Sequence, residues 1–370
     1  MRAQGYVANI SRGKQVGQIT PFTLVLSGGG MKGLAHVGVF QALDERGLTP
    51  ALVVGSSMGS LVGAAWACGI PTDEMRARAL AVQRRHVFKV AHADMALRRM
   101  LSPAVYRREP LEMLIAELVG ECNLRDVRRR LLINTVDINS GAQVAWGVPG
   151  FDDAPLADVV FASCALPGIF PPREIRGRWY VDGAVLENLP VRVAAAAASW
   201  PILAVNVAAT SVRRADIEKQ GFAATYIRGL EIVMQTQIEA TLRHWKGPPL
   251  VLVQPPVEDI SMFAFDRTAE LLDAGYAATL DALDRLGCRL DQLGPGLHPT
   301  RWVRVQVDET RCVGCGVCAA QAPTVFRLGR RGKAHVLAPV QQWSPLDEAC
   351  VQGCPSGAIT LDPAEPATAA

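Results

Sequence analysis

The stretch VVGSSMGSLVG, residues 53–63, leads an apolar, strand-like segment into a glycine, places two serines at the bend and continues with small residues that suit a helix. It contains the pattern Gly-x-Ser-x-Gly over residues 55–59, with Ser57 at the centre. Glycines on both sides permit a sharp strand-to-helix turn that lifts the serine clear of a sheet. Ser57 is therefore a candidate nucleophile, although these five residues are equally typical of a helix start capped by Ser56 or Ser57.

Apolar runs and helix-period segments alternate on either side of this turn. We predict strands over residues 22–26, 52–55, 131–138, 202–207 and 250–255. We predict helices over residues 31–46, 58–68, 222–245 and 266–285. The alternation indicates an α/β fold with a mostly parallel central sheet and helices on both faces. The uncharged run 193–210 has the length of a transmembrane span, but Ser199, Trp200 and Pro201 at its centre favour a turn followed by a buried strand.

The charge of the chain excludes one class of partner. The formal net charge is +3 over 370 residues, which is too small to indicate nucleic acid. One segment is locally basic, because residues 71–110 carry nine Lys or Arg. This suits either a solvated helical face or contact with an anionic membrane surface, for which we name Arg98, Arg99, Arg107 and Arg108. The N-terminus has no apolar core of signal-peptide length, so we expect a cytoplasmic protein, with peripheral contact at the inner membrane surface as the further hypothesis.

A second glycine-rich segment, LSGGGMKGLAHVG over residues 26–38, also follows a predicted strand and opens a helix. The N–H groups of Gly28, Gly29 and Gly30 can gather there, where the partial positive charge of a helix start favours an anion. Dinucleotide-binding loops share this spacing, but the acidic residue expected about 20 positions later is missing. An oxyanion hole beside Ser57 explains both glycine-rich segments, so we expect no nucleotide cofactor.

A carboxylate completes the set of candidate catalytic groups. Asp182 ends a short predicted strand in RWYVDGAVLENLPV, residues 178–191, where it could also simply cap a loop. Together, GGGMKG (28–33), GSSMG (55–59), SCALPGIFPP (163–172) and DGA (182–184) give residues 21–290 the motif order of one family. In these motifs and their spacing the segment resembles the bacterial patatin-like phospholipases.

The resemblance implies a fold, a reaction and roles for named residues. It implies a three-layer α/β/α sandwich and a phospholipase A or lysophospholipase type of carboxylic ester hydrolysis. Ser57 would attack the acyl carbonyl and Asp182 would accept its proton, with no histidine. Gly28, Gly29 and Gly30 would supply the oxyanion hole. Lys32 occupies the family's usual basic position, where it either binds substrate phosphate or is a solvated helix-start lysine.

A Ser–acid–His triad is the alternative to the dyad, and it needs a histidine after Asp182. The candidates are His244, His298 and His335, none of which directly follows a predicted core strand. We therefore favour the dyad and keep a triad through His244 as the alternative. We expect His36, on the helix after the glycine loop, in the core or beside the site.

Five of the nine cysteines crowd into residues 312–354. Cys312, Cys315 and Cys318 follow the spacing C-x2-C-x2-C, and Cys354 precedes a proline, as in the cysteine ligands of iron–sulfur cubanes. Residues 301–361 resemble small single-cluster bacterial ferredoxins. The resemblance implies one [4Fe-4S] cluster held by these four cysteines; a four-cysteine zinc site is the alternative.

Two neighbouring positions refine the cysteine assignment. Ala322 stands where a two-cluster sequence has a further cysteine, so we expect a single cluster. Cys350 is the fifth cysteine of the group, and we expect a buried thiol outside the cluster.

The stretch LGPGLHPT, residues 293–300, contains two prolines and two glycines and marks a domain boundary. We predict an N-terminal tail, a hydrolase domain, a linker, a [4Fe-4S] domain and a C-terminal tail, over residues 1–20, 21–290, 291–300, 301–361 and 362–370. The expected function is a lipid acyl hydrolase carrying an electron-transfer or redox-sensing module, with a phospholipid or other acyl ester as substrate and a redox protein as a partner. The alternative is an electron-transfer protein in which the hydrolase fold is a docking scaffold.

Overall fold

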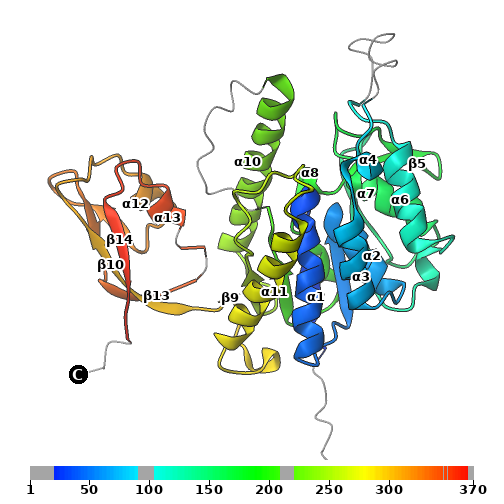
Figure 1. Ribbon diagram of the computed structural model, residues 1–370. Coiled ribbons are helices and arrows are strands. Elements are labelled where there is room, and N and C mark those ends of the chain that lie inside the picture. Colours follow the sequence, from blue (N-terminus) through cyan, green and yellow to red (C-terminus); the bar gives the residue numbers. More distant parts are fainter. Residues whose placement is uncertain (1–20, 91–103, 209–220, 345, 348, 366–370) are drawn as a thin grey trace, which may run out of the picture.

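The computed structural model describes residues 21–90, 104–208, 221–344, 346–347 and 349–365. A large α/β body comprises most of the chain, and a small C-terminal module lies to one side of it (Figure 1). The predicted tails, apart from residues 362–365, and the predicted lipid contacts Arg98 and Arg99 lie outside the described residues.

The central sheet is mostly parallel, as the alternation of strands and helices predicts. Its order is β5-β6-β3-β2-β1-β7-β8-β9, and β4 also pairs with β3. The parallel strands are β1 (Thr23–Leu26), β2 (Leu52–Ser56), β3 (Leu131–Asp137), β7 (Ile202–Val205), β8 (Leu250–Val253) and β9 (Leu297–His298). Antiparallel pairing with β3 adds β4 (Ala142–Trp146) and β6 (Arg178–Asp182), and β5 (Arg173–Ile175) pairs with β6.

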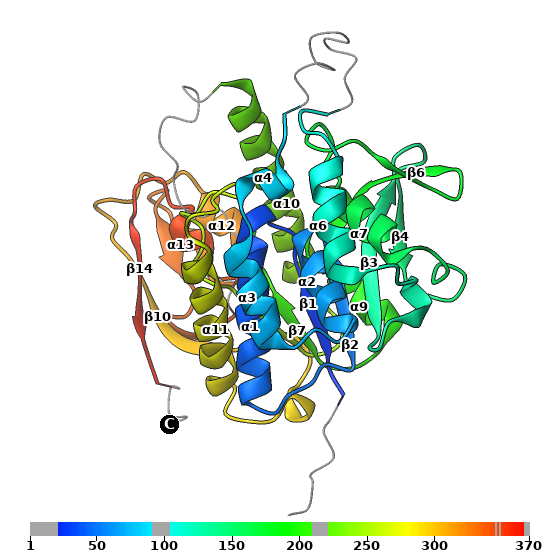
Figure 2. The same ribbon diagram turned by 45° about the vertical axis from the view of Figure 1, so that its right-hand side comes forward.

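Helices cover both faces of this sheet (Figure 2). They are α1 (Ala35–Glu45), α2 (Met58–Ala67), α3 (Thr72–Ala81), α4 (Arg84–Val87), α6 (Glu109–Val119), α7 (Leu156–Cys164), α8 (Ala184–Glu187), α9 (Val191–Ala197), α10 (Phe222–Arg243) and α11 (Thr268–Asp284), with 3-10 turns η1 (Gly30–Leu34), η3 (Leu124–Asp126) and η5 (Leu290–Gln292). No helix in the described part of the chain is long and apolar enough to cross a membrane.

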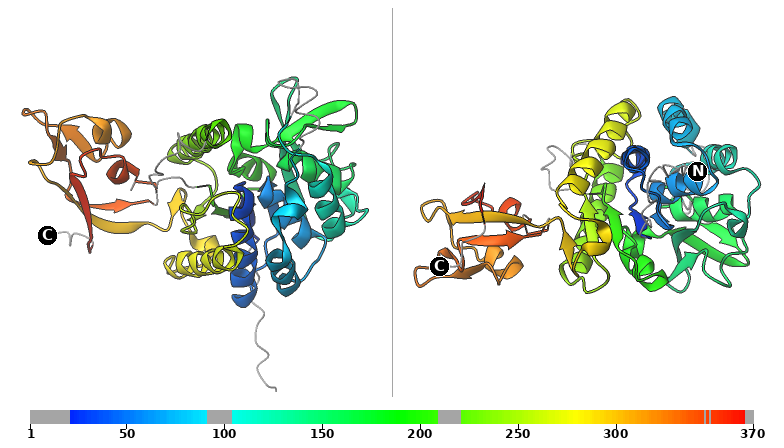
Figure 3. Two further views of the ribbon diagram at one scale, coloured as in Figure 1. Left: turned by 45° about the horizontal axis from the view of Figure 1, so that its top comes forward. Right: turned by 90° about the horizontal axis from the view of Figure 1, so that it is seen from below.

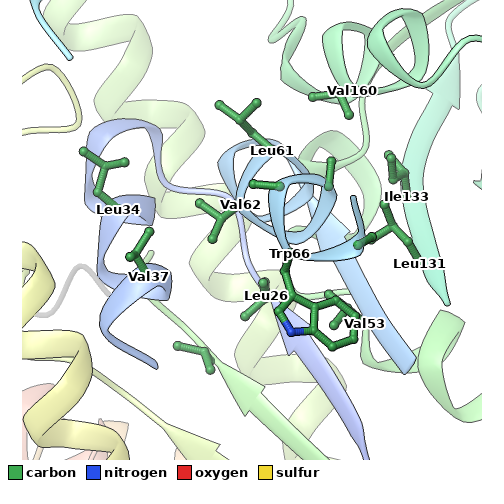
Figure 4. Close-up of a cluster of buried hydrophobic side chains, with 14 of the residues drawn as sticks. Leu26, Leu34, Val37, Val53, Leu61, Val62, Trp66, Leu131, Ile133 and Val160 are labelled. Carbon is green, nitrogen blue, oxygen red and sulfur yellow. The ribbon is translucent and has the colours of Figure 1, made fainter. Parts of the chain in front are cut away.

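Two apolar clusters sandwich the sheet because neighbouring strand residues point to opposite faces. On β1, Leu24 and Leu26 belong to the larger cluster and Val25 to the smaller one. The larger cluster joins the strands to α1, α2, α6, α7 and α11, and Figure 4 shows Leu26 and Val53 beneath Trp66 and its neighbours on α2. Strands buried on both faces read as continuous apolar runs, which is why they are recognisable from the sequence.

The C-terminal module has a small core of its own. It contains β10 (Arg301–Val307), β13 (Val340–Trp343) and β14 (Ile359–Pro363) in one antiparallel sheet, the hairpin β11 (Phe326–Leu328) with β12 (Ala334–Val336), and helices α12 (Val317–Gln321) and α13 (Ala349–Gln352). Three cysteines, Cys312, Cys318 and Cys350, belong to this core.

Strand pairing and a side-chain hydrogen bond, in addition to the polypeptide chain itself, connect the module to the α/β body. The predicted linker contains β9, which pairs with β8 at the edge of the large sheet. The Arg243 side chain at the end of α10 donates a hydrogen bond from Nη1 to the Gln321 carbonyl, at 3.0 Å. The two further views in Figure 3 show the module extending from this side of the body.

Candidate active site and cysteine site

Ser57 lies at the sharp turn between β2 and α2. Its backbone has φ 52° and ψ −126°, which is an unusual conformation for a residue with a side chain. The flanking glycines are sterically required. A methyl group at Gly55 would lie 2.6 Å from the Gly59 carbonyl oxygen, and one at Gly59 would lie 2.3 Å from the Leu26 carbonyl oxygen. The pattern Gly-x-Ser-x-Gly therefore creates the turn by letting α2 approach β1 and β2 closely.

Hydrogen bonds hold this strained turn in place. The Ser57 N–H donates to Ser163 Oγ at 2.9 Å, and the Ser163 hydroxyl donates to the Asn134 carbonyl on β3 at 2.8 Å. The Ser57 carbonyl accepts from Ser60 Oγ at 2.6 Å. The backbone of Ser57 is thus tied to α7, β3 and α2, which leaves its side chain as the free part of the turn.

Asp182 ends β6 and lines the same cavity as Ser57. The aspartate is only 2% exposed, and its Oδ1 accepts from the Ala184 N–H at 2.9 Å. Burial raises the pKa of Asp182 to about 7, against the opposing effects of the hydrogen bond from the Ala184 N–H and of the nearby Ser57 side chain. Such a carboxylate is a much stronger base than a solvated one, and it lies next to a serine hydroxyl.

The glycine loop lies directly against Ser57. A methyl group at Gly28 would lie 2.8 Å from Ser57 Cβ. The Gly28 N–H is already engaged, because it donates to Asn188 Oδ1 at 3.0 Å, which differs from the expectation that it supplies an oxyanion donor. Within the described residues, no hydrogen bond engages the N–H of Gly29 or Gly30, which begin the 3-10 turn η1. These two groups are the available donors of the loop.

One cavity of about 80 Å³ brings these groups together. Its lining includes Ser57, Asp182 and the three glycines, and its remaining walls are mainly apolar: Phe88, Leu166, Ile169, Phe170, Met234, Met262 and Phe263. Lys32 also lines it and is only 2% exposed, so the interpretation of Lys32 as a solvated lysine is wrong. Mainly apolar walls with a few polar groups are typical of a site for an apolar ligand.

None of the predicted histidine alternatives lies in this cavity lining. His244 follows the last residue of α10, and His298 and His335 lie in β9 and β12. His36 is buried, as expected, and its Nε2 donates to the Ser27 carbonyl at 2.8 Å, just before the glycine loop. Burial lowers the pKa of His36 to about 4, so the ring is neutral near pH 7. It supports the end of β1 and does not contact Ser57 through any hydrogen bond of the described residues.

Sequence reasoning missed two polar residues that hold the site. Ser163 anchors the Ser57 turn, and Asn188 anchors Gly28 through a buried amide that is 160 positions away in the chain. Both lie inside stretches that mark the site, SCALPGIFPP and RWYVDGAVLENLPV. A buried polar residue beside a catalytic motif is the signal that could have identified them.

Cys312, Cys315, Cys318 and Cys354 line a second, very small cavity in the C-terminal module. Two backbone N–H groups point at the sulfurs: Ala334 at 3.4 Å from Cys312 Sγ and Ala358 at 3.4 Å from Cys354 Sγ. Among the described residues, no three Cys, His, Asp or Glu side chains converge on a single metal ion. A cubane places each cysteine on a different iron atom, so four thiols around one cavity with N–H groups aimed at sulfur fit a [4Fe-4S] cluster.

Cys350 does not line this cavity. It is buried, and its thiol donates to the Asp347 carbonyl at 2.9 Å. Burial raises the pKa of Cys350 to about 12, so it remains a thiol. Its place in the module's core agrees with the prediction of a buried thiol.

Two family descriptions match separate parts of the chain. Residues 24–195 match "Patatin-like phospholipase", and residues 305–361 match "4Fe-4S single cluster domain".

The two curated relatives described next match 45% and 73% of the chain. An uncharacterized NTE family protein of Mycobacterium tuberculosis is 32% identical over 168 residues, which cover 45% of this chain and 44% of that protein. The lysophospholipase NTE1 of Saccharomyces cerevisiae is 25% identical over 301 residues, covering 73% of this chain and 16% of its own length. The chain thus spans less than half the length of these relatives. Among solved structures, VipD from Legionella pneumophila is 14% identical with a TM-score of 0.39, covering 72% of this chain and 67% of that chain.

Proposed function

We propose, from the premise that this chain contains a patatin-like phospholipase domain and a 4Fe-4S single cluster domain, that it hydrolyses carboxylic ester bonds of lipids and carries one iron–sulfur cluster. The observation that carries the hydrolase assignment is that Ser57 and the buried Asp182 carboxylate line one mainly apolar cavity together with the glycine loop. A serine and a base in one cavity, next to unengaged backbone donors, are the parts that acyl transfer requires.

In the proposed reaction, Ser57 Oγ attacks the ester carbonyl carbon and its proton passes to Asp182. The carbonyl oxygen becomes negative, and the alkoxide of the lipid leaves as an alcohol when Asp182 returns the proton to it. An acyl group is then bound to Ser57. Water adds to this acyl-enzyme with Asp182 again accepting a proton, which releases a fatty acid and restores the serine.

The proposed oxyanion donors are the N–H groups of Gly29 and Gly30. Gly28 supports them differently, since its own N–H is bonded to Asn188. Donors fixed before the reaction gain strength as the carbonyl oxygen becomes charged, and one such donor is typically worth about 3 kcal/mol. Lys32 is buried in the lining of the same cavity, as is Glu231, and Lys32 is the proposed contact for a substrate phosphate.

The proposed substrate is a lipid ester with an apolar acyl chain. Aromatic, leucine, isoleucine and methionine side chains form most of the cavity wall, so an acyl chain would be desolvated there while its carbonyl meets Ser57. The similarity to a protein named lysophospholipase supports the same class of substrate.

The proposed cluster ligands are Cys312, Cys315, Cys318 and Cys354, with Ala334 and Ala358 donating to two of the sulfurs. A [4Fe-4S] group, when bound, supplies one-electron chemistry. The chain's own contribution is to orient the four thiolates, to aim N–H groups at them and to cover them with apolar side chains such as Leu328. We assign residues 21–290 to the hydrolase unit and 301–361 to the cluster unit, with β9 of the intervening segment docked on the large sheet.

The test is hydrolysis of a lysophospholipid by the purified, cluster-containing chain and its Ser57→Ala variant. The proposal predicts release of fatty acid by the wild type, its loss in the variant and an unchanged iron–sulfur absorption spectrum in both. Hydrolysis that survives in Ser57→Ala would contradict the assigned nucleophile. A cluster-containing wild type that cleaves no lipid or simple acyl ester would instead support the scaffold alternative.

A further inference from the structure

We propose that the hairpin covering the cysteine loop is the docking surface for a one-electron redox protein whose cofactor is surrounded by acidic side chains. The hairpin comprises β11, β12 and their connecting turn, residues 326–336, and we call it the basic hairpin. The inference rests on the proposed function in one respect, namely that the four cysteines hold an iron–sulfur cluster.

The basic hairpin lies directly on the cysteine loop. The Ala334 N–H donates to Cys312 Sγ at 3.4 Å. A methyl group at Gly314 would lie 2.3 Å from the Gly332 carbonyl oxygen, so the turn of the hairpin and the cysteine loop touch through their backbones. Leu328 and Ala334 form part of the cavity that the four cysteines line. The hairpin is therefore close to the cluster position as well as to solvent.

The charge of this hairpin has a single sign. Its sequence, FRLGRRGKAHV, contains Arg327, Arg330, Arg331 and Lys333 and no aspartate or glutamate. The three arginines are exposed, and none forms a salt bridge with a described residue. Lys333 donates a hydrogen bond to the Cys312 carbonyl, which fixes one positive charge beside a proposed ligand. Positive charge concentrated in this way attracts an acidic partner over roughly 10 Å at moderate salt.

An apolar patch lies between these charges and the cysteines. Val313 is 67% exposed and Leu328 is 46% exposed, and both line the cysteine cavity. Cys315 in the same loop is itself exposed. An apolar centre with a charged rim is the usual composition of a protein interface, and here the centre lies beside the proposed cluster ligands.

Positive charge continues on the other side of the cysteine site. Arg311 lies against the turn after Cys354, since a methyl group at Gly357 would lie 2.8 Å from Arg311 Nη2. The Arg311 N–H donates to Asp308 Oδ1 at 3.3 Å, so this arginine has a carboxylate beside it, whereas the basic hairpin contains none.

A redox protein fits this surface better than an anionic membrane does. Electron transfer requires close approach to the cluster, and both the charge and the exposed apolar residues are placed where the ligand loop meets solvent. Binding to lipid head groups would gain nothing from that placement. In the proposed encounter one electron passes between the partner's cofactor and the cluster, one being oxidised as the other is reduced, and no bond forms or breaks.

The test measures electron transfer from a reduced, acidic flavodoxin to the full-length, cluster-containing protein by stopped flow. We expect the second-order rate constant to fall as salt is added. Arg331→Glu should lower it about fivefold at low salt, and Arg330→Glu with Arg331→Glu about tenfold or more. The matched control is Arg304→Glu, which makes the same charge change at an exposed position on β10 and should alter the rate less than about twofold. Calorimetric binding of oxidised flavodoxin should weaken in the same order.

Each contrary result has its own meaning. A rate that is independent of salt, or equal effects of Arg331→Glu and Arg304→Glu, would overturn the docking surface. Binding to phosphatidylglycerol vesicles that needs Arg330 and Arg331, with electron transfer unaffected in their variants, would assign the surface to membranes and also overturn it. Iron and sulfide analysis before the kinetic experiment separates these results from failure of the proposed cluster, in which case the protein as purified contains no iron.

Discussion

The turn at Ser57 and the loop at Cys312 to Cys318 are both short, glycine-containing segments that lead into a helix, yet different forces fix them. Ser57 lies between β2 and α2, and its N–H donates to Ser163, which is 106 positions away and is itself bonded to Asn134. The cysteine loop lies in a module whose core includes Cys312 and Cys318 themselves. The large α/β fold therefore shapes the Ser57 turn. In the C-terminal module, by contrast, the cysteines themselves form part of the apolar core.

This difference predicts how the two regions depend on their chemical groups. The α/β body buries two apolar clusters around a nine-stranded sheet and needs no bound group to bury them. The C-terminal module has one small cluster, and domains of this size often need a metal or a disulfide for stability. We therefore expect the hydrolase site to survive loss of the cluster, while the module does not.

The largest expected effect comes from removing the proposed nucleophile, which eliminates hydrolysis and leaves the C-terminal module unchanged. Ser57→Ala should lower kcat/KM for ester hydrolysis by about 10⁴-fold to 10⁶-fold, because the nucleophile is lost while the turn and Asp182 remain. The iron content and thermal unfolding of the module should not change. A decrease of less than about tenfold would mean that another residue attacks the ester.

Loss of the cluster is the complementary change. Cys354→Ser should remove the cluster and the unfolding transition of the C-terminal module, as followed by visible absorption and calorimetry. Hydrolysis should remain within about twofold of wild type. Cys350→Ser is the matched control, since it alters a buried thiol outside the cavity and keeps a donor for the Asp347 carbonyl. If Cys354→Ser abolished hydrolysis and Cys350→Ser did not, the two regions would be coupled.

A smaller effect is expected from a single methyl group in the glycine loop. Gly30 has φ 58°, and a methyl group there would lie 2.6 Å from the Met262 carbonyl oxygen. Gly30→Ala should displace the proposed oxyanion donors and lower kcat by about 10²-fold. Gly47 has φ 64° but open space around it, so Gly47→Ala carries a similar backbone strain of about 1 kcal/mol without reaching the site. Equal activity in the two variants would argue against the glycine loop as an oxyanion hole.

The last expected effect concerns stability and not activity. Burial raises the pKa of Asp182 from 3.8 to about 7. Above pH 7 the carboxylate is charged, and its burial then destabilises the folded state. Below pH 4 the group is protonated in the folded and the unfolded state alike, so this destabilisation is absent. Asp182→Asn removes that charge and keeps an oxygen that can accept from Ala184. The variant should be more stable than wild type at pH 8, by up to about 4 kcal/mol, and the difference should vanish as the pH falls through 7 towards 4. Denaturant unfolding at several pH values measures this, and a variant less stable than wild type at pH 8 would contradict it.

The buried parallel strands were predictable because strands covered on both faces form continuous apolar runs, as in Thr23–Leu26 and Ile202–Val205. Of the antiparallel edge, only the short strand that Asp182 ends was predicted. Strand β4 of this edge is largely exposed at Ala142 and Gln143, so it has no continuous apolar run. The small strand β9 lies in a stretch rich in glycine and proline, and only its pairing with β8 identifies it.

Prediction from the sequence is also limited at individual residues of the site. The motif residues follow from local spacing, and the structure places Ser57 and Asp182 in the lining of one cavity, although their catalytic roles remain predictions. The engagement of the Gly28 N–H depends on Asn188, which no local pattern connects to it. The burial of Lys32 likewise depends on elements that pack over η1 from distant parts of the sequence.

The pH dependence of Ser57 labelling by a fluorophosphonate, located by peptide mass spectrometry, tests the central claim most directly. The predicted result is a single adduct on Ser57 whose rate of formation rises with a pKa near 7 and is lost in Asp182→Asn, because the buried carboxylate must be charged to accept the serine proton. An adduct on another residue, or a rate on Ser57 that neither changes between pH 5 and 8 nor depends on Asp182, would contradict it.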